Sequence, residues 1–300
     1  MKITSPALDL AIKISRCPNL SPALNNANNP CHSVVSCQPG MTGRQLPEPW
    51  FGNIENAKVL FLSSNPSIDT SDYEIAEDFP VHEWDDQKIG SWHIDRVDPN
   101  VTPMGVSFGL PNLPNFLWHC RDNEYRGQGP KSKSPQKTWN GIHQRALEII
   151  GQSASPSENY ALTEIVHCKS INAKGVKEAS STCADMWLQR IIATSSQAKI
   201  VVLVGSYVRD LVRDGLFSLP SDFGTNTSGI SHLEALTRDT FVSSALGRPL
   251  LFVYLPHPTS FMPKTIINIY GQEVQSALQK ISSSATFDLP TTEDWIRSVK

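Results

Sequence analysis

The sequence predicts an α/β fold, a three-layer α/β/α arrangement with a central, mainly parallel four-stranded sheet. Four apolar runs end abruptly at small or polar residues, which is typical of strands buried on both faces of a parallel sheet. Segments with helical periodicity separate these runs, and such alternation forms βαβ units with helices on both faces. The four predicted strands are 59–62, 161–166, 200–204 and 250–255.

The first segment of the chain, residues 1–30, is predicted to be an N-terminal arm. It contains a low-complexity run from Asn25 to Pro30, so we expect a loosely ordered segment or one short helix. The main domain is expected to span 31–285, with an insertion at 70–104, and a C-terminal tail follows at 286–300.

Helices are predicted where apolar residues recur every three or four positions. Ile142, Ala146 and Ile149 indicate such a helix after Thr138, and Gly151 is suited to end it. Three further helices are predicted at 184–193, 207–212 and 264–281.

Charge and hydropathy limit the classes of partner. The net charge is −3 and no apolar run reaches the length of a membrane span, so no membrane partner is expected. The first 20 residues lack the compact apolar block of a signal peptide, so the expected location is cytoplasmic. Positive charge for a nucleic acid must then be local. A basic loop supplies it at Arg126, Lys131, Lys133 and Lys137.

Chemically informative residues lie at the ends of the predicted strands. Because the carboxyl ends of parallel strands share one edge of a sheet, Asn65, Glu164, Gly205 and His257 should come together there. Ligands of open α/β sheets bind at that edge, which makes it the expected site.

Five motifs, taken in order, resemble the uracil-DNA glycosylase superfamily. They are Ser63-Ser64-Asn65-Pro66-Ser67, Gly105-Val106-Ser107-Phe108-Gly109, Leu162-Thr163-Glu164-Ile165-Val166-His167-Cys168, Ile200-Val201-Val202-Leu203-Val204-Gly205 and His257-Pro258-Thr259-Ser260. The likeness covers residues 31–281 outside the insertions. The Asn-Pro and Gly-x-x-Phe-Gly motifs are most similar to the mismatch and single-strand-selective branches.

The resemblance implies a monofunctional DNA glycosylase that flips a base and hydrolyses its N-glycosidic bond, leaving an abasic site. It implies that Asn65 orients the attacking water and that His257 stabilises negative charge on the departing base. No motif lysine is placed to form a Schiff base, so strand cleavage is not expected. The expected base-binding residues are Ser64, Ser67, Phe108, which would stack on the flipped base, and Glu164.

Two departures from the family pattern indicate the substrate. Glu164 stands where uracil-excising members carry an Asn, and a carboxylate accepts from the amine of cytosine. If burial keeps Glu164 protonated, it could also donate to N3. Ser67 replaces a bulky Tyr and leaves room at C5. A C5-modified cytosine, such as a glycosylated phage base, is therefore expected, in an anti-phage defence role.

Several alternatives stay open at this point. Glu164 could face solvent or pair with Lys169, and the protein could excise uracil in DNA repair or only read modified bases without catalysis. The acidic insertion carries Trp84 and Trp92, which could enclose a large C5 group, although a solvated surface excursion would explain it too.

The expected partner is duplex DNA with a modified base, and no nucleotide cofactor is expected. Lys169 should meet phosphates together with the basic loop. The run after His257 lies where the family's loop enters the minor groove, and an apolar side chain there would fill the gap left by a flipped base. This run contains Thr259, Ser260, Phe261 and Met262.

Six cysteines suggest a metal site, because in a reducing compartment they are not expected to pair. Their placement resembles the iron–sulfur branch of the superfamily, which implies a [4Fe–4S] cluster. The implied ligands are Cys31, Cys37, Cys168 and Cys183. The five-residue gap between the first pair departs from the usual two, and Cys17 could replace either member. Zinc or four unpaired buried cysteines are the alternatives.

Overall fold

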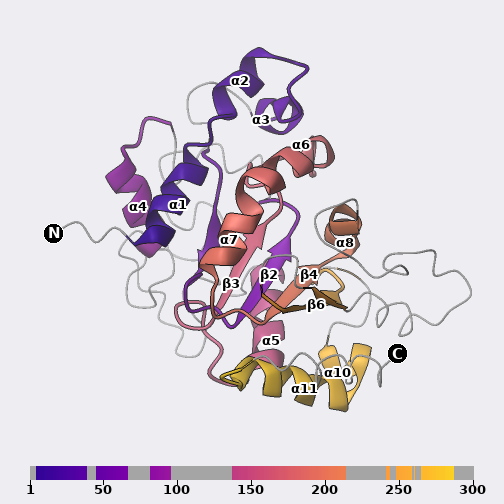
Figure 1. Ribbon diagram of the computed structural model, residues 1–300. Coiled ribbons are helices and arrows are strands. Elements are labelled where there is room, and N and C mark those ends of the chain that lie inside the picture. Colours follow the sequence, from indigo (N-terminus) through magenta and orange to yellow (C-terminus); the bar gives the residue numbers. More distant parts are fainter. Residues whose placement is uncertain are drawn as a thin grey trace, which may run out of the picture.

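A computed structural model shows a mixed α/β protein with a mostly parallel, six-stranded sheet flanked by helices (Figure 1). The strand order is β1-β3-β2-β4-β6-β5. The structure describes residues 5–38, 45–66, 82–95, 137–213, 241–243, 248–258, 260 and 265–286.

The four central strands run parallel and correspond to the four predicted ones. They are β3 (Tyr160–Glu164), β2 (Val59–Ser63), β4 (Ile200–Val204) and β6 (Leu250–Leu255). Every residue in them is buried except Ser63, as expected for apolar runs covered on both faces.

The prediction of a four-stranded sheet is wrong in its number, because two edge strands extend the sheet. They are β1 (Trp50–Gly52) and β5 (Phe241–Ser243), and both pair antiparallel to their neighbours. A segment of three residues is too short to show the alternation by which strands are recognised in a sequence.

The order of the parallel strands creates a switch point in the topology. From β2 the chain moves to β3 on one side, and from β3 it crosses to β4 on the other side of β2. After β4 the chain continues to β5 and β6, which lie on the side of β4 away from β2. The connections that leave the carboxyl ends of the neighbouring strands β2 and β4 therefore run in opposite directions. A crevice that can take a ligand forms where neighbouring connections diverge in this way.

On one side of the sheet lie α5 (Lys137–Ile150), α10 (Ile266–Tyr270) and α11 (Gln272–Ser283) (Figure 1). His143 of α5 hydrogen-bonds to the Tyr160 hydroxyl at 3.0 Å and so joins the helix to the sheet. The predicted helix after Thr138 is confirmed. The last predicted helix, 264–281, is instead two helices separated at Gly271, whose φ of +89° does not continue a helix.

On the other side the connection from β3 to β4 is one continuous helical stretch. It consists of α6 (Val176–Cys183), the π-helical turn η4 (Ala184–Leu188) and α7 (Gln189–Thr194). A π turn inside a helix is rare and often marks a functional site. After β4 the chain forms α8 (Ser206–Arg213), close to the predicted 207–212.

The N-terminal segment is not the loose arm that its composition suggested. It forms α1 (Pro6–Ser15) and α2 (Leu20–Asn25), and α3 (His32–Ser36) follows. Ser5 caps α1 by accepting from the Leu8 N–H at 3.1 Å. Ala7, Leu10, Ala11 and Ile14 are buried at helical spacing, so α1 is part of the core.

The insertion is described from residue 82 to residue 95 and contains α4 (Asp86–Asp95), which packs against α1. Arg16 donates to the Asp86 carboxylate at 3.1 Å, and Ser15 Oγ lies 2.9 Å from His93 Nε2. This part of the insertion is therefore attached to the N-terminal helix rather than projecting freely into solvent. Among the residues described, no helix is both long and apolar enough to cross a membrane.

Candidate functional site

The register of the sheet brings the predicted site residues to one edge. Ser63 pairs with Glu164, Leu62 with Leu203, and Val204 with Leu255. Ser64 and Asn65 continue from β2, Gly205 from β4 and His257 from β6. The prediction that Asn65, Glu164, Gly205 and His257 share the carboxyl edge of the sheet is therefore confirmed.

The Asn65 side chain is half-buried and its orientation is fixed. Its Nδ2 donates to the Pro66 carbonyl and to Ser170 Oγ, each at 2.8 Å. A carbonyl oxygen can only accept, so the atom facing Pro66 must be the amide nitrogen. Both amide hydrogens are then used, and Oδ1 is the end of the amide that accepts. The Ser64 hydroxyl donates to it over 3.4 Å.

The Glu164 side chain ends β3 beside Ser63 and is only 8% exposed. The alternative that this carboxyl faces solvent is therefore wrong. The Lys169 ammonium forms an ion pair with Glu48, with Nζ and Oε1 2.6 Å apart.

Lys169 itself is buried, at 5% exposure, and its charge is matched by the Glu48 carboxylate. Taking an ammonium out of a buried ion pair costs several kcal/mol, which is more than one phosphate contact returns. Burial in this ion pair disfavours the predicted contact of Lys169 with DNA phosphate.

His257 is half-buried, and burial lowers its pKa, so the neutral imidazole prevails at neutral pH. Its backbone packs against Gly205, where an added Cβ would lie 3.2 Å from the His257 Cβ. Gly205 has a φ of +88°, a conformation that few residues other than glycine adopt. Only a glycine fits here without strain or crowding.

The turn after His257 is held in place by α5. Ser260 N donates to the His257 carbonyl at 2.8 Å, which closes the turn. Pro258 packs against Gly141 so closely that a Cβ on this glycine would lie 2.3 Å from the proline Cβ. The close contact sets the position of the loop that carries His257.

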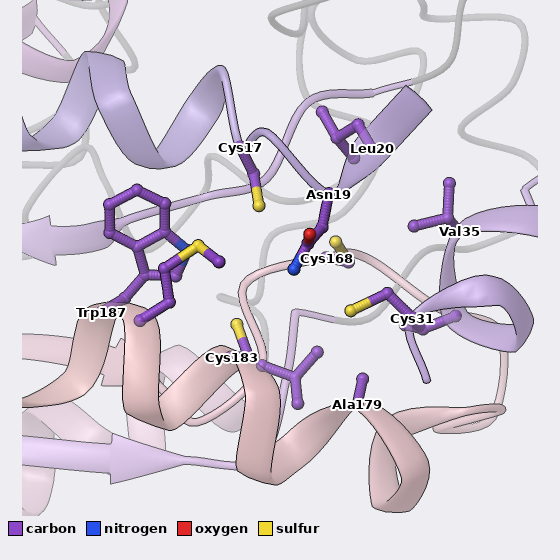
Figure 2. Close-up of a pocket in the computed structure, with 12 residues that line it drawn as sticks. Cys17, Asn19, Leu20, Cys31, Val35, Cys168, Ala179, Cys183 and Trp187 are labelled. Carbon is purple, nitrogen blue, oxygen red and sulfur yellow. The ribbon is translucent and has the colours of Figure 1, made fainter. Parts of the chain in front are cut away.

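A second candidate site is a cavity lined by four thiols near the carboxyl end of β3 (Figure 2). Cys17 follows α1, Cys31 precedes α3, Cys168 follows β3 and Cys183 ends α6. Figure 2 shows their sulfurs directed toward a common space. The other lining residues are Asn19, Leu20, Val34, Val35, Val166, Ala179, Met186 and Trp187.

The electrostatics of this cavity disfavour four free thiolates. Burial raises the pKa of Cys17 and Cys31, and it raises the pKa of Cys183 to about 12. The pKa of Cys168 is raised well above its usual value, first by burial and then by repulsion from the neighbouring cysteines. Four buried thiolates would need a compensating positive charge, such as that of a metal centre.

Hydrogen bonds are already directed at two of the sulfurs. Cys17 receives the backbone N–H of Asn19 and the side-chain N–H of Trp187, while Cys183 receives the backbone N–H of His167. Each of these bonds lowers the pKa of the thiol against the larger effect of burial. N–H donors to sulfur are the interactions that surround metal-bound thiolates.

Cys37, a predicted ligand, is not one of the residues that line the cavity, whereas Cys17, its predicted alternative, is. The Cys37 thiol instead donates to the Val34 carbonyl at 3.2 Å. Cys31 and Cys37 flank the same short helix, and six residues at about 100° each place them on different faces of it. Cys37 remains near enough to contribute to the raised pKa of Cys168.

Zinc and an iron–sulfur cluster place different demands on the arrangement of four thiolates. Zinc holds its thiolates at roughly 2.3 Å, which brings all four sulfurs close together. Within the described part of the chain, no three His, Cys, Asp or Glu side chains form a group that could hold one metal ion. In an iron–sulfur cluster the four cysteine sulfurs lie farther apart, because each thiolate binds a different iron atom.

Several predicted site residues lie outside the described residues or have undescribed side chains. Lys137 begins α5, but its side chain is not described, and Ser260 is half-buried in the turn after His257. The predicted residues outside the described part are Ser67, Phe108, Arg126, Lys131, Lys133, Thr259, Phe261 and Met262.

The sequence interpretation missed three residues that contact the predicted motifs or cysteines, namely Ser170, Gly141 and Trp187. No sequence signal marks Ser170 or Gly141, because their contacts join segments far apart in the chain. The chain matches no family model, and a search of curated proteins found no match.

Proposed function

We propose that this chain is a monofunctional DNA glycosylase on a three-layer α/β/α scaffold. It flips a base out of the duplex and hydrolyses its N-glycosidic bond. The observation that carries the proposal is the pair of neutral groups at the switch point. Asn65 offers an oriented amide oxygen, and His257 is kept neutral by burial on the same edge of the sheet.

These two groups suit a dissociative cleavage. The bond between C1′ and the base nitrogen breaks, and its electron pair leaves with the base. A neutral imidazole can donate one hydrogen bond to the negative charge that develops there. The sugar gains cationic character, so the water that adds to C1′ needs orientation more than a strong base. Asn65 Oδ1 accepts one water hydrogen, and the released proton passes to solvent.

The buried carboxyl of Glu164 supports cytosine as the parent base. A carboxyl at the carboxyl edge of β3 accepts from the exocyclic amine at C4, which uracil lacks. Together with the small Ser67, this favours a C5-modified cytosine, and an anti-phage role would follow from the occurrence of such bases in phage genomes.

We further propose that Cys17, Cys31, Cys168 and Cys183 hold a [4Fe–4S] cluster. Iron would supply the positive charge that four buried thiolates need, and it would join the N-terminal helices to β3 and α6. No step of the hydrolysis depends on it. Asn19, His167 and Trp187 contribute the N–H donors to the sulfurs.

A glycosylase assay tests the activity. Duplexes with uracil, cytosine or a C5-modified cytosine at one position are incubated with the protein and then treated with alkali, which cleaves at abasic sites. We expect cleavage only with modified cytosine. Asn65→Ala and His257→Ala should each lower the rate about 100-fold or more.

The matched control is Asn53→Ala. Asn53 is also half-buried and its Nδ2 also donates to a carbonyl, that of Ser157 at 3.1 Å, but it precedes β2 and lies at the opposite end of that strand. Its loss should leave the rate unchanged. Cleavage of uracil alone would support DNA repair instead. Binding without any abasic product would make the protein a reader of modified bases.

A further inference from the structure

Ser170 lies six residues beyond β3, and no sequence motif marks it. It is fully buried, and its side chain reaches back to the segment after the carboxyl end of β2. There its Oγ accepts one of the two Nδ2 hydrogens of Asn65 at 2.8 Å. The backbone N–H of Ser170 donates to the Pro66 carbonyl at 3.1 Å.

These contacts form a closed arrangement around one amide. Pro66 O accepts from both Asn65 Nδ2 and the Ser170 N–H, while Ser170 Oγ accepts the second Nδ2 hydrogen. Rotating the Asn65 amide by 180° would place Oδ1 against the Pro66 carbonyl, and two acceptors would then face each other. Such a rotation loses the bond to Pro66 and requires the Ser170 hydroxyl to donate instead of accept, so the arrangement favours one orientation.

The segment that carries Ser170 is itself held on both sides. Gln38 Nε2 donates to the Lys169 carbonyl at 3.1 Å, and the Lys169 ammonium pairs with Glu48 at 2.6 Å. Cys168, one residue earlier, lines the cysteine cavity. Ser170 is therefore on rigid, buried backbone, which is what a residue that orients another side chain requires.

We propose that Ser170 is a positioning residue that holds the Asn65 amide with Oδ1 as its accepting end. This inference rests on the proposed function for its catalytic consequence, but not for its structural one. Without the Ser170 oxygen, Asn65 Nδ2 keeps only its bond to Pro66, and the amide can rotate away from the orientation that places water at C1′.

The kinetic arm compares Ser170→Ala with Ser170→Thr, which keeps an Oγ. We expect Ser170→Ala to lower kcat by between about tenfold and 100-fold with KM unchanged. Ser170→Thr should retain most of the activity. In an Asn65→Ala background, Ser170→Ala should have no further effect, because Ser170 acts only through Asn65. A further loss of rate in that background would overturn the proposal.

Ser282→Ala is the matched control for a lost buried hydroxyl. Ser282 is 2% exposed and its Oγ donates to the Ile149 carbonyl at 2.9 Å, far from the sheet edge in α11. Ser282→Ala should lower the melting temperature about as much as Ser170→Ala does, while leaving kcat unchanged. An equal loss of kcat in both variants would mean that Ser170 matters only for stability.

The structural arm does not depend on activity. In protein labelled with ¹⁵N at asparagine, the Asn65 side-chain NH₂ pair should show slow hydrogen exchange in the wild type and fast exchange in Ser170→Ala. The Asn159 amide, whose Nδ2 donates to the Ser153 carbonyl at 2.9 Å, should be unaffected and serves as the internal reference.

The two arms separate the two hypotheses. Unchanged Asn65 exchange in Ser170→Ala overturns the positioning role, whatever the enzyme does. A wild type that cleaves no base in the panel but shows the Asn65 change leaves the positioning of Asn65 intact and overturns the glycosylase proposal instead.

Discussion

Trp187 donates its indole N–H to the sulfur of Cys17, although one residue belongs to the π turn η4 and the other follows the first helix of the chain. Burial raises the pKa of Cys17, and this bond, with that from the Asn19 N–H, opposes the rise. A donor directed at a buried sulfur favours the thiolate, which is the form that binds metal.

The first prediction distinguishes the two candidate fourth ligands. Cys17→Ala should remove the brown colour and most of the iron from protein prepared without oxygen, because Cys17 lines the cavity. Cys37→Ala should keep the colour and the iron, because the Cys37 thiol donates a hydrogen bond to the Val34 carbonyl instead. Iron per chain and visible absorbance measure the result. Iron loss in Cys37→Ala with retention in Cys17→Ala would contradict the assignment, and iron-free wild-type protein would exclude the cluster.

The second prediction concerns the donor to Cys17. Trp187→Phe removes the indole N–H but keeps most of the buried ring, so iron should be released to a chelator roughly tenfold faster than from the wild type. Absorbance decay under excess chelator gives the rate. Trp50→Phe is the control, because Trp50 is a half-buried tryptophan in β1 that does not line the cavity. Equal rates of iron release in both variants would show that the Trp187 hydrogen bond to Cys17 does not help to retain the iron.

The third prediction compares two glycines whose backbone conformation would be strained for any other residue. Gly205 and Gly151 have φ of +88° and +99°, so alanine is strained at both. Only at Gly205 does the new Cβ meet another residue, His257, at 3.2 Å, while nothing lies within 4 Å at Gly151.

Gly205→Ala should therefore lower both stability and glycosylase activity, and Gly151→Ala should lower stability by about 1 kcal/mol with activity intact. Thermal melting and the alkali assay measure the two effects. Full activity in Gly205→Ala would show that the contact with His257 does not matter for the reaction.

The fourth prediction addresses base preference. Glu164→Asn replaces an acceptor of the cytosine amine by an amide that can also donate, so preference should shift from cytosine-type toward uracil-type bases. One such contact is worth about 1–3 kcal/mol, or roughly 5-fold to 150-fold in relative kcat/KM. Competition between two labelled duplexes measures the ratio. An unchanged ratio would favour uracil repair over modified cytosine.

The fifth prediction follows from a buried histidine far from the cysteines. Burial lowers the pKa of His143 from its usual 6.5, and its Nδ1 lies 3.0 Å from the Tyr160 hydroxyl. Below pH 6.5 the unfolded chain binds a proton at this position more readily than the native protein does. The stability that His143 contributes is therefore present above pH 6.5 and is lost as pH falls through the lowered pKa.

Urea unfolding at several pH values between 7 and 4 tests this. His143→Gln should show a weaker loss of unfolding free energy with falling pH than the wild type. His82→Gln, at an exposed position, should follow the wild type. The burial of His257 also makes the wild-type unfolding free energy fall with pH. The difference between the wild type and His143→Gln is therefore the informative quantity. If the unfolding free energy falls with pH equally in the wild type and His143→Gln, His143 does not contribute to the pH dependence of stability.

The parallel core and the edge at which the site lies could be predicted from the amino-acid sequence alone. Apolar runs such as 59–62 and 200–204 are buried whichever helices cover them, and parallel strands necessarily share a carboxyl edge. For this reason Asn65, Glu164 and His257 could be assigned to one place from their positions alone.

Which side chains meet could be learned only from the folded chain. Cys17 rather than Cys37 lines the cavity because the two cysteines around α3 lie on different faces of that helix. Ser170 reaches Asn65, and Lys169 pairs with Glu48, across more than a hundred residues of chain. Local periodicity reports which face of an element is buried, but the partner on that face comes from another part of the chain, and the local pattern does not encode it.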